Sequence, residues 1–168
     1  KLRVEFGDVQ PVFNHYAGIA RGADAATARR IATNLMQWPS GVAPRAEAQA
    51  MLERDALVGK PLNIRLTRTN SQTLDLAQPL GRKRLLYVWA PQAADTAPPK
   101  LTQFAGTLGD MQVVYLLIGV KTVRAQALAA AAPAGATVCF TEQGLGSPLI
   151  DGLKTRQAPY VYLFSAAG

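Results

Sequence analysis

The first third of the chain carries apolar residues at the three- and four-residue steps that are typical of helices. Asp24 precedes one such stretch, which predicts a helix that is capped by this side chain and runs to about Trp38. A second helix is predicted from Pro44 or Arg45 to Leu57. Two short amphipathic helices cannot bury both apolar faces alone. We therefore expect them to pack on the rest of the chain, a second copy or another protein.

From Val58 onward the pattern changes to that of strands. Two alternating stretches separated by Asn70-Ser71 predict a hairpin. Continuous apolar stretches predict further strands, and helical stretches separate them: strands at 85–89, 112–119, 136–140 and 160–164, and helices near 98–108 and 122–132. Strands that alternate with helices imply parallel pairing through crossovers. The pattern therefore predicts an α/β sandwich around a mixed sheet.

Composition restricts the chemistry. The 168 residues are 49% hydrophobic and 17% charged, which fits one packed domain with at most a small appendage. The chain contains 1 Cys and 1 His, so it cannot form an internal disulfide or a zinc site of the usual Cys/His kind. We expect no metal and no cofactor.

The net charge of +7 comes from 18 Lys and Arg against 11 Asp and Glu, and the densest basic run is Arg82-Lys83-Arg84. Such a charge favours acidic partners, although charges that only solvate the surface explain it too. No nucleic-acid motif supports it, so nucleic-acid binding is disfavoured. No apolar run is long enough to predict a membrane span. The start at Lys1 suggests either a mature exported form or a trimmed chain.

Three segments carry a resemblance to a known family: Leu57-Val-Gly-Lys-Pro-Leu, Gly81-Arg-Lys-Arg-Leu-Leu-Tyr-Val-Trp-Ala-Pro, and Gln157-Ala-Pro before Tyr160-Val-Tyr-Leu-Phe. In this order they resemble the thioredoxin fold, and more closely the periplasmic thiol-disulfide oxidoreductases of the TlpA and cytochrome c maturation type. The resemblance implies a thioredoxin-like three-layer α/β/α sandwich with a mixed central sheet and a cis peptide bond before Pro159. It divides the chain into a helical N-terminal extension, residues 1–56, and a thioredoxin-like domain, residues 57–168.

The departure from that family concerns its Cys-x-x-Cys motif. Aligning Trp89-Ala90 with the family's Trp-Ala places Ala93 and Thr96 where the two cysteines stand. A slip of two residues changes nothing, because no cysteine lies between residues 86 and 105. Disulfide exchange needs a thiolate nucleophile and a second, resolving thiol. We therefore lean against an enzyme.

The single cysteine and the single histidine lie elsewhere. Cys139 falls in a predicted strand, where a free cysteine is usually a small buried hydrophobe. The alternative is a reactive or partner-linking thiol. His15 is the only candidate imidazole base, and a surface or capping role is favoured for it.

The leading hypothesis is a redox-inactive protein that acts in protein binding or assembly in the periplasm or another exported location. In the family, a groove between the Trp-Ala loop and the proline loop binds an extended peptide. The resemblance implies that Ala158, before Pro159, offers its backbone to such a peptide, with Trp89 and Tyr160 nearby and Asp95 at a helix N-terminus. Plain core packing is the alternative for Trp89 and Tyr160.

Two other functions remain open: a redox protein that works through Cys139 and a partner thiol, and a basic protein that binds an anionic surface or nucleic acid. The expected partner is an unidentified envelope protein or a second copy. If the chain naturally ends at Gly168, strand 160–164 becomes a sheet edge that invites pairing. Residues 1–56 are predicted to be a docking or dimerisation arm.

Overall fold

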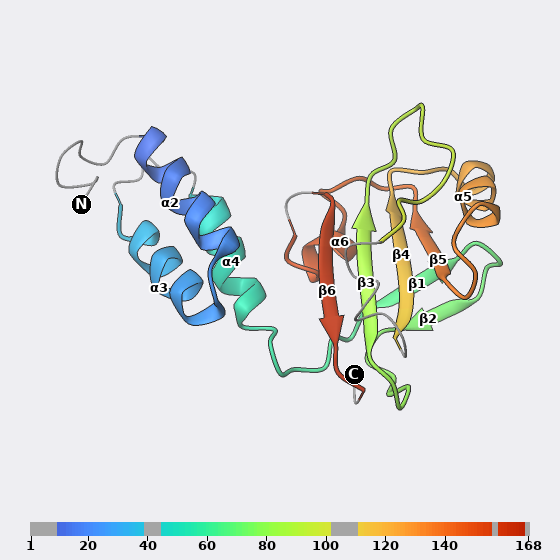
Figure 1. Cartoon of the computed structure of the whole chain (residues 1–168), viewed down its shortest axis with the longest axis horizontal. Helices are drawn as coiled ribbons and strands as arrows, with labels where there is room; N and C mark the ends of the chain where they lie inside the picture. Colours follow the sequence, from blue (N-terminus) through green and yellow to red (C-terminus); the bar gives the residue numbers. More distant parts are fainter. Residues whose placement is uncertain (1–9, 39–44, 102–110, 156–157, 167–168) are drawn as a thin grey trace. The chain divides into compact units, whose positions relative to one another are not determined.

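The computed structural model describes residues 10–38, 45–101, 111–155 and 158–166 (Figure 1). The chain forms two compact units, Lys1–Lys60 and Pro61–Gly168, and each is treated by itself below.

The first unit contains the helices α2 (Gln10–Gly22), α3 (Ala25–Met36) and α4 (Arg45–Asp55). The predicted cap of α3 is confirmed, because Asp24 Oδ1 accepts a hydrogen bond from the backbone amide of Thr27 at 3.0 Å. The two helices predicted in this part of the chain are α3 and α4. Helix α2 was not predicted.

The three helices share a core built around aromatic rings. Trp38 meets the rings of Phe13 and Tyr16 edge-on, at centroid distances of 6.0 and 6.2 Å. The buried members of this cluster come from all three helices or from the residues that follow them: Val12, Phe13, Ala17, Leu35, Trp38 and Ala48. Helix α2 therefore supplies apolar surface that the two predicted helices lacked.

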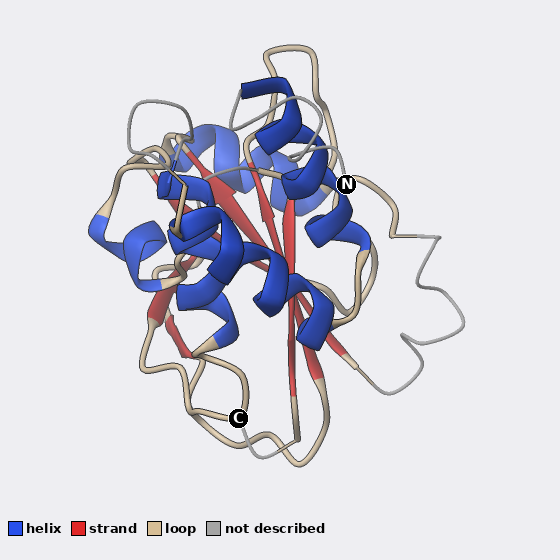
Figure 2. Ribbon diagram, turned by 90° about the vertical axis from the view of Figure 1, so that its left-hand side faces the viewer, coloured by secondary structure: helices blue, strands red, loops and turns tan. Residues whose placement is uncertain are grey.

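The second unit is built on a mixed sheet, as predicted. Its described strands are β1 (Arg65–Arg68), β2 (Thr73–Asp75), β3 (Arg84–Trp89), β4 (Gln112–Ile118), β5 (Thr137–Thr141) and β6 (Tyr160–Phe164). They stand in the order β2-β1-β5-β4-β3-β6. Strands β3, β4 and β5 run parallel, whereas β1, β2 and β6 pair in antiparallel fashion. Figure 2 shows the strands crossing one another at an angle, so the sheet is twisted.

One face of the sheet is covered by α5 (Thr122–Ala130). Ala125 and Leu128 of this helix pack into a core with Leu85 and Leu117 of the sheet. Side chains of a strand alternate between its faces, so this face also carries the other odd-numbered residues of β3. We call it the α5 face.

The opposite face carries α6 (Pro148–Gly152), which was not predicted as a helix. Tyr162 is paired with Leu86, so both project away from the α5 face. The Tyr162 hydroxyl donates to the carbonyl oxygen of Leu153 at 2.5 Å, directly after α6. Helices therefore cover both faces, which confirms the three-layer sandwich. We call this side the α6 face.

The predicted strands and the hairpin are confirmed within the described residues. Ser71, in the hairpin turn, has a φ of 65°. The helix predicted near residues 98–108 differs, because residues 98–101 form a loop rather than a first helical turn. The rest of that predicted helix lies outside the described residues.

Candidate binding site

The two loops singled out from the sequence lie at one edge of the sheet. β3 and β6 are antiparallel, and Val88 near the end of β3 pairs with Tyr160 at the start of β6. The loop after Trp89 therefore begins beside the segment that enters β6 (Figure 1). That segment contains the Ala158–Pro159 peptide bond, which is cis, as the family resemblance implied.

The loop after Trp89 is held by hydrogen bonds to its own backbone. Asp95 Oδ2 accepts from the Gln92 amide at 2.6 Å, and the Asp95 amide donates to the Gln92 carbonyl at 3.1 Å. The Arg124 guanidinium of α5 donates to the same carbonyl. Ala93 and Thr96 are exposed in this loop. The structure thus shows the Asp95 carboxylate shaping a turn, while a role at a helix N-terminus stays a prediction.

Trp89 and Tyr160 do not share a surface. Trp89 is half-buried on the α5 face, where it packs against the core around Leu85. Tyr160 pairs with Val88 and so projects onto the α6 face, where its ring lies 5.0 Å from that of Tyr162. The two side chains therefore flank the sheet edge from opposite sides.

Ala158 and Pro159 directly precede Tyr160 at the entry to β6. Ala158 is half-buried and Pro159 is exposed. No hydrogen bond of the Ala158 backbone is found within the described residues. Within the described part of the chain, this amide and this carbonyl thus have no backbone partner.

A tyrosine pair below the loop was missed by sequence reasoning. The Tyr115 hydroxyl donates to the Pro99 carbonyl at 2.9 Å, and the Tyr87 ring meets the Tyr115 ring edge-on at 5.9 Å. Burial raises the pKa of both phenols. Pairing of Tyr87 with Tyr115 in the register of β3 and β4 explains the contact, and register is not readable from the sequence.

Cys139 lies away from this edge. It sits in β5, which β4 separates from β3, and its pairing with Leu116 places it on the α6 face. The side chain is 0% exposed, and burial raises the pKa of its thiol to about 12 although Arg68 and Arg84 lower it. The structure therefore does not bring Cys139 together with Ala93, Thr96 or the proline loop.

Other candidate chemistry is sparse in the described part of the chain. His15 is exposed on α2, with its ring 6.0 Å from that of Tyr16. No cluster of His, Cys, Asp or Glu that could hold a metal ion is found among the described residues. No helix within the described ranges is long and apolar enough to cross a membrane.

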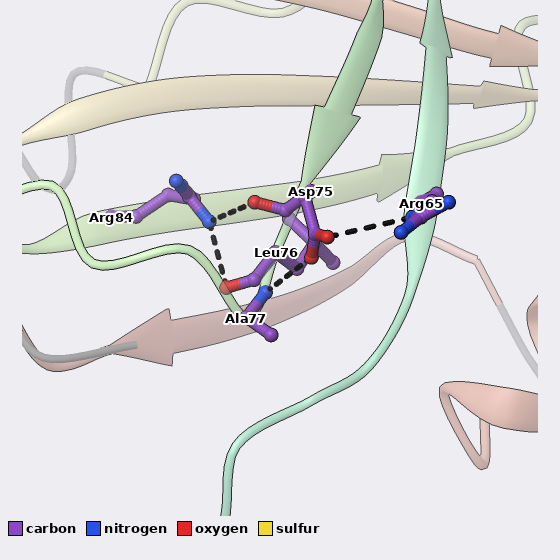
Figure 3. Close-up of polar contacts among 5 residues, drawn as sticks. All are labelled: Arg65, Asp75, Leu76, Ala77 and Arg84. Atoms are coloured by element: carbon purple, nitrogen blue, oxygen red, sulfur yellow. Dashed lines mark hydrogen bonds and ion pairs between the residues drawn. The ribbon is translucent and has the colours of Figure 1, made fainter.

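Arg84 departs from the alternative in which the basic residues, the run Arg82-Lys83-Arg84 among them, only solvate the surface. Arg84 is 2% exposed. Its Nε donates to Gln112 Oε1 at 2.8 Å, and its Nη1 donates to the carbonyl oxygens of Leu76 and Asp75 at 2.9 and 3.4 Å (Figure 3). Burial lowers its pKa. Arg84 thus ties the end of the hairpin to the central strands.

The sequence matches no protein-family model and no curated protein. Solved structures do match. One is a secreted Mycobacterium tuberculosis disulfide oxidoreductase homologous to E. coli DsbE, with a TM-score of 0.50 and 17% identity over 66% of this chain and 82% of that chain. Another is MTB DsbF, with a TM-score of 0.49 and 15% identity over 64% and 81% of the two chains. A thioredoxin-like protein from Aeropyrum pernix has a TM-score of 0.47 and 10% identity over 71% and 84%.

At 17% identity the first of these similarities concerns the fold alone. It agrees with the mixed sheet, the helices on both faces and the cis peptide bond before β6. The chain therefore has a thioredoxin-like fold, similar to that of a disulfide oxidoreductase.

Proposed function

We propose that the Pro61–Gly168 unit is a redox-inactive thioredoxin-like domain that binds an extended segment of a partner protein. The observation that carries the proposal is the pairing of Val88 with Tyr160. It sets the loop after Trp89 beside the cis Ala158–Pro159 bond at one sheet edge. In this proposal the partner segment pairs with the backbone at this edge, and the recognition needs no sulfur in the loop.

Recognition through the backbone does not depend on a thiol. An extended peptide that adds to a chain as a strand gains affinity from main-chain hydrogen bonds. Ala158 supports this mode, because its amide and carbonyl have no partner within the described residues. Trp89 on one side of the edge and Tyr160 on the other supply apolar surface for side chains of the bound segment.

The chemistry of the site favours binding over electron transfer. Ala93 has no nucleophilic atom, and Thr96 has a hydroxyl that cannot form a disulfide. The alternative through Cys139 is disfavoured by a thiol that is 0% exposed with a pKa of about 12. Its thiolate fraction at pH 7 is on the order of 10⁻⁵, and the thiolate is the reactive form.

The alternative of a basic protein that binds an anionic surface or nucleic acid rests on the net charge of +7 alone. Binding of that kind weakens steeply with salt. Pairing of a peptide with the Ala158 backbone relies on main-chain hydrogen bonds and not on the net charge, so salt should weaken it little. Binding measured at low and at high salt therefore separates the two functions.

The proposed partner is an exported protein of the cell envelope, and the proposed location of this chain is the periplasm or the exterior. The similar M. tuberculosis oxidoreductase is a secreted protein, which supports the proposal. Residues 1–56 serve in it as a docking or dimerisation arm, for which the helices α2, α3 and α4 provide a core of their own.

The test uses the whole chain, isotope-labelled, and a cysteine-free extended peptide as the probe. We expect NMR shifts at the Ala158 amide and the Trp89 indole. Ala93→Arg, which puts a bulky charge in the exposed loop, should weaken binding about tenfold. The control Val58→Arg alters a residue that is 76% exposed outside the loop and should bind normally. Shifts confined to other residues, or equal binding by both variants, would contradict the proposal.

A further inference from the structure

The loop after Trp89 is long for a segment without regular structure, since none of residues 90–101 belongs to a helix or a strand. Ordering such a loop costs conformational entropy, which contacts with the rest of the fold must offset. Its two ends are fixed by packing, because Trp89 and Leu101 both lie against the core under α5. Hydrogen bonds hold the mostly exposed stretch between them.

Gln92 is the point at which this stretch is held. Its amide donates to Asp95 Oδ2 at 2.6 Å, and its carbonyl oxygen accepts from the Asp95 amide at 3.1 Å. These two contacts are local and close a turn. The third reaches across the fold, because the Arg124 guanidinium donates to the same carbonyl oxygen from 32 positions away in the sequence. A charged donor makes this the stronger kind of hydrogen bond.

Arg124 reaches the loop from a well-packed helix. It lies in the first turn of α5, which stands beside the loop (Figure 1). The next residue, Ala125, is 0% exposed and packs with Leu128 into the core of the sheet. Within the described residues Arg124 forms no ion pair. Its contact with the loop is therefore the interaction that the structure gives to this side chain.

The far end of the loop is tied to a different element. The Tyr115 hydroxyl of β4 donates to the Pro99 carbonyl oxygen at 2.9 Å, and Tyr115 is 1% exposed. Two elements thus hold the loop backbone at two points, α5 at Gln92 and β4 at Pro99. The positions that match the family's cysteines, Ala93 and Thr96, lie between these two points.

We propose that Arg124 and Tyr115 are positioning residues that hold the loop after Trp89 in its binding conformation before a partner is bound. Neither side chain touches the partner, and each acts through the backbone of the loop. The inference rests on the proposed function, because it explains how that site binds. A loop ordered in advance loses little entropy on binding, and the affinity falls with the fraction of molecules in which the loop has this conformation.

The first experiment needs no partner and uses the free, whole chain. NMR follows solvent exchange of the Asp95 amide, which reports whether the turn is closed. Arg124→Met should speed this exchange about tenfold, the equivalent of one hydrogen bond from a charged donor. Arg124→Lys keeps a charged donor and should restore part of the protection. The matched control is Lys121→Met, which removes the same charge from an exposed residue at the start of α5 and should change nothing.

The second experiment measures the affinity of the same chains for the cysteine-free extended peptide. Arg124→Met should weaken binding about tenfold and Tyr115→Phe about fivefold, the equivalent of one neutral hydrogen bond. Lys121→Met should bind normally. So should Tyr87→Phe, which removes a hydroxyl from the ring beside Tyr115 that has no hydrogen bond within the described part of the chain.

Unchanged exchange of the Asp95 amide in Arg124→Met would overturn the proposal. Faster exchange with unchanged affinity would overturn the role of Arg124 in binding, as would equal effects of Lys121→Met and Arg124→Met. A natural chain that binds no peptide would contradict the proposed function. The exchange experiment on the free chain still decides in that case whether Arg124 holds the loop.

Discussion

At Cys139 the loss of water around the thiol outweighs the attraction of two nearby guanidinium groups. The pKa rises to about 12 although Arg68 and Arg84 both lower it. The register with Leu116 explains the burial, because it turns the side chain toward the covered α6 face. Cys139, the only thiol of the chain, thus stays protonated because it is buried.

This raised pKa predicts a pH dependence of stability. A thiol ionises near pH 9.0 in the unfolded chain but only near 12 in the folded one, so the unfolded state loses its proton first. Stability therefore falls as pH rises above about 9, by roughly 1.4 kcal/mol per unit up to the folded pKa. Urea unfolding at pH 8 and 10.5 should show a smaller loss for Cys139→Ala than for the natural chain. The buried tyrosines affect both proteins alike, and equal losses would contradict the prediction.

Arg84 is the second residue whose burial has a consequence. Arg84→Ala leaves Gln112 Oε1 and the Leu76 carbonyl without their donor in a buried place. We expect the free energy of unfolding to fall by about 2–4 kcal/mol. The exposed neighbour offers a control, because Arg82→Ala should change it by less than about 0.5 kcal/mol. Chemical denaturation measures both, and similar values would show that Arg84 is not a structural cation.

At the scale of elements, the cap of α3 is the clearest link from sequence to structure. Hydrogen bonds from the first turn, Thr27 above all, lower the pKa of Asp24, so its stabilising effect persists at neutral pH and is lost as pH falls through that lowered pKa. Asp24→Ala should speed hydrogen exchange of the Thr27 amide. Asp24→Asn keeps an acceptor without the charge and should retain protection without this acid dependence. Unchanged exchange in Asp24→Ala would exclude the cap.

The strands of the second unit were predictable and two helices were not. β3 and β4 read as continuous apolar runs because both of their faces are covered. Helix α2 has no acidic residue in its first turn, so the sequence shows no such signal for its start. Its apolar side chains pack against Trp38, which follows α3 and is distant in the sequence. Helix α6 is 5 residues long, and its signal was Ser147-Pro148, a cap followed by proline at the first position.

At the scale of the whole molecule, the order of motifs along the chain predicted the sheet edge where the candidate site lies. It did not predict how side chains are distributed there. Trp89 and Tyr160 were both expected near the proline loop, and the pairing of Val88 with Tyr160 turns their side chains to opposite faces of the sheet. The burial of Arg84 was likewise hidden, since a run of three basic residues gives no sign of which one a hairpin covers.

If Ala93 and Thr96 occupy the positions of a lost dithiol, restoring two cysteines there should restore redox chemistry. We expect Ala93→Cys/Thr96→Cys to reduce insulin in the presence of dithiothreitol. The control Ala127→Cys/Ala130→Cys places an exposed pair at the same spacing on α5 and should stay near background. Equal activity of the two variants would show that the loop holds no special position.

The central claim is that this thioredoxin-like chain binds without performing disulfide exchange. The most direct measurement is the rate at which the natural chain accelerates insulin reduction by dithiothreitol. We predict the background rate, because the loop has no thiol and Cys139 is fully buried. A rate above background that rises with protein concentration would contradict the claim.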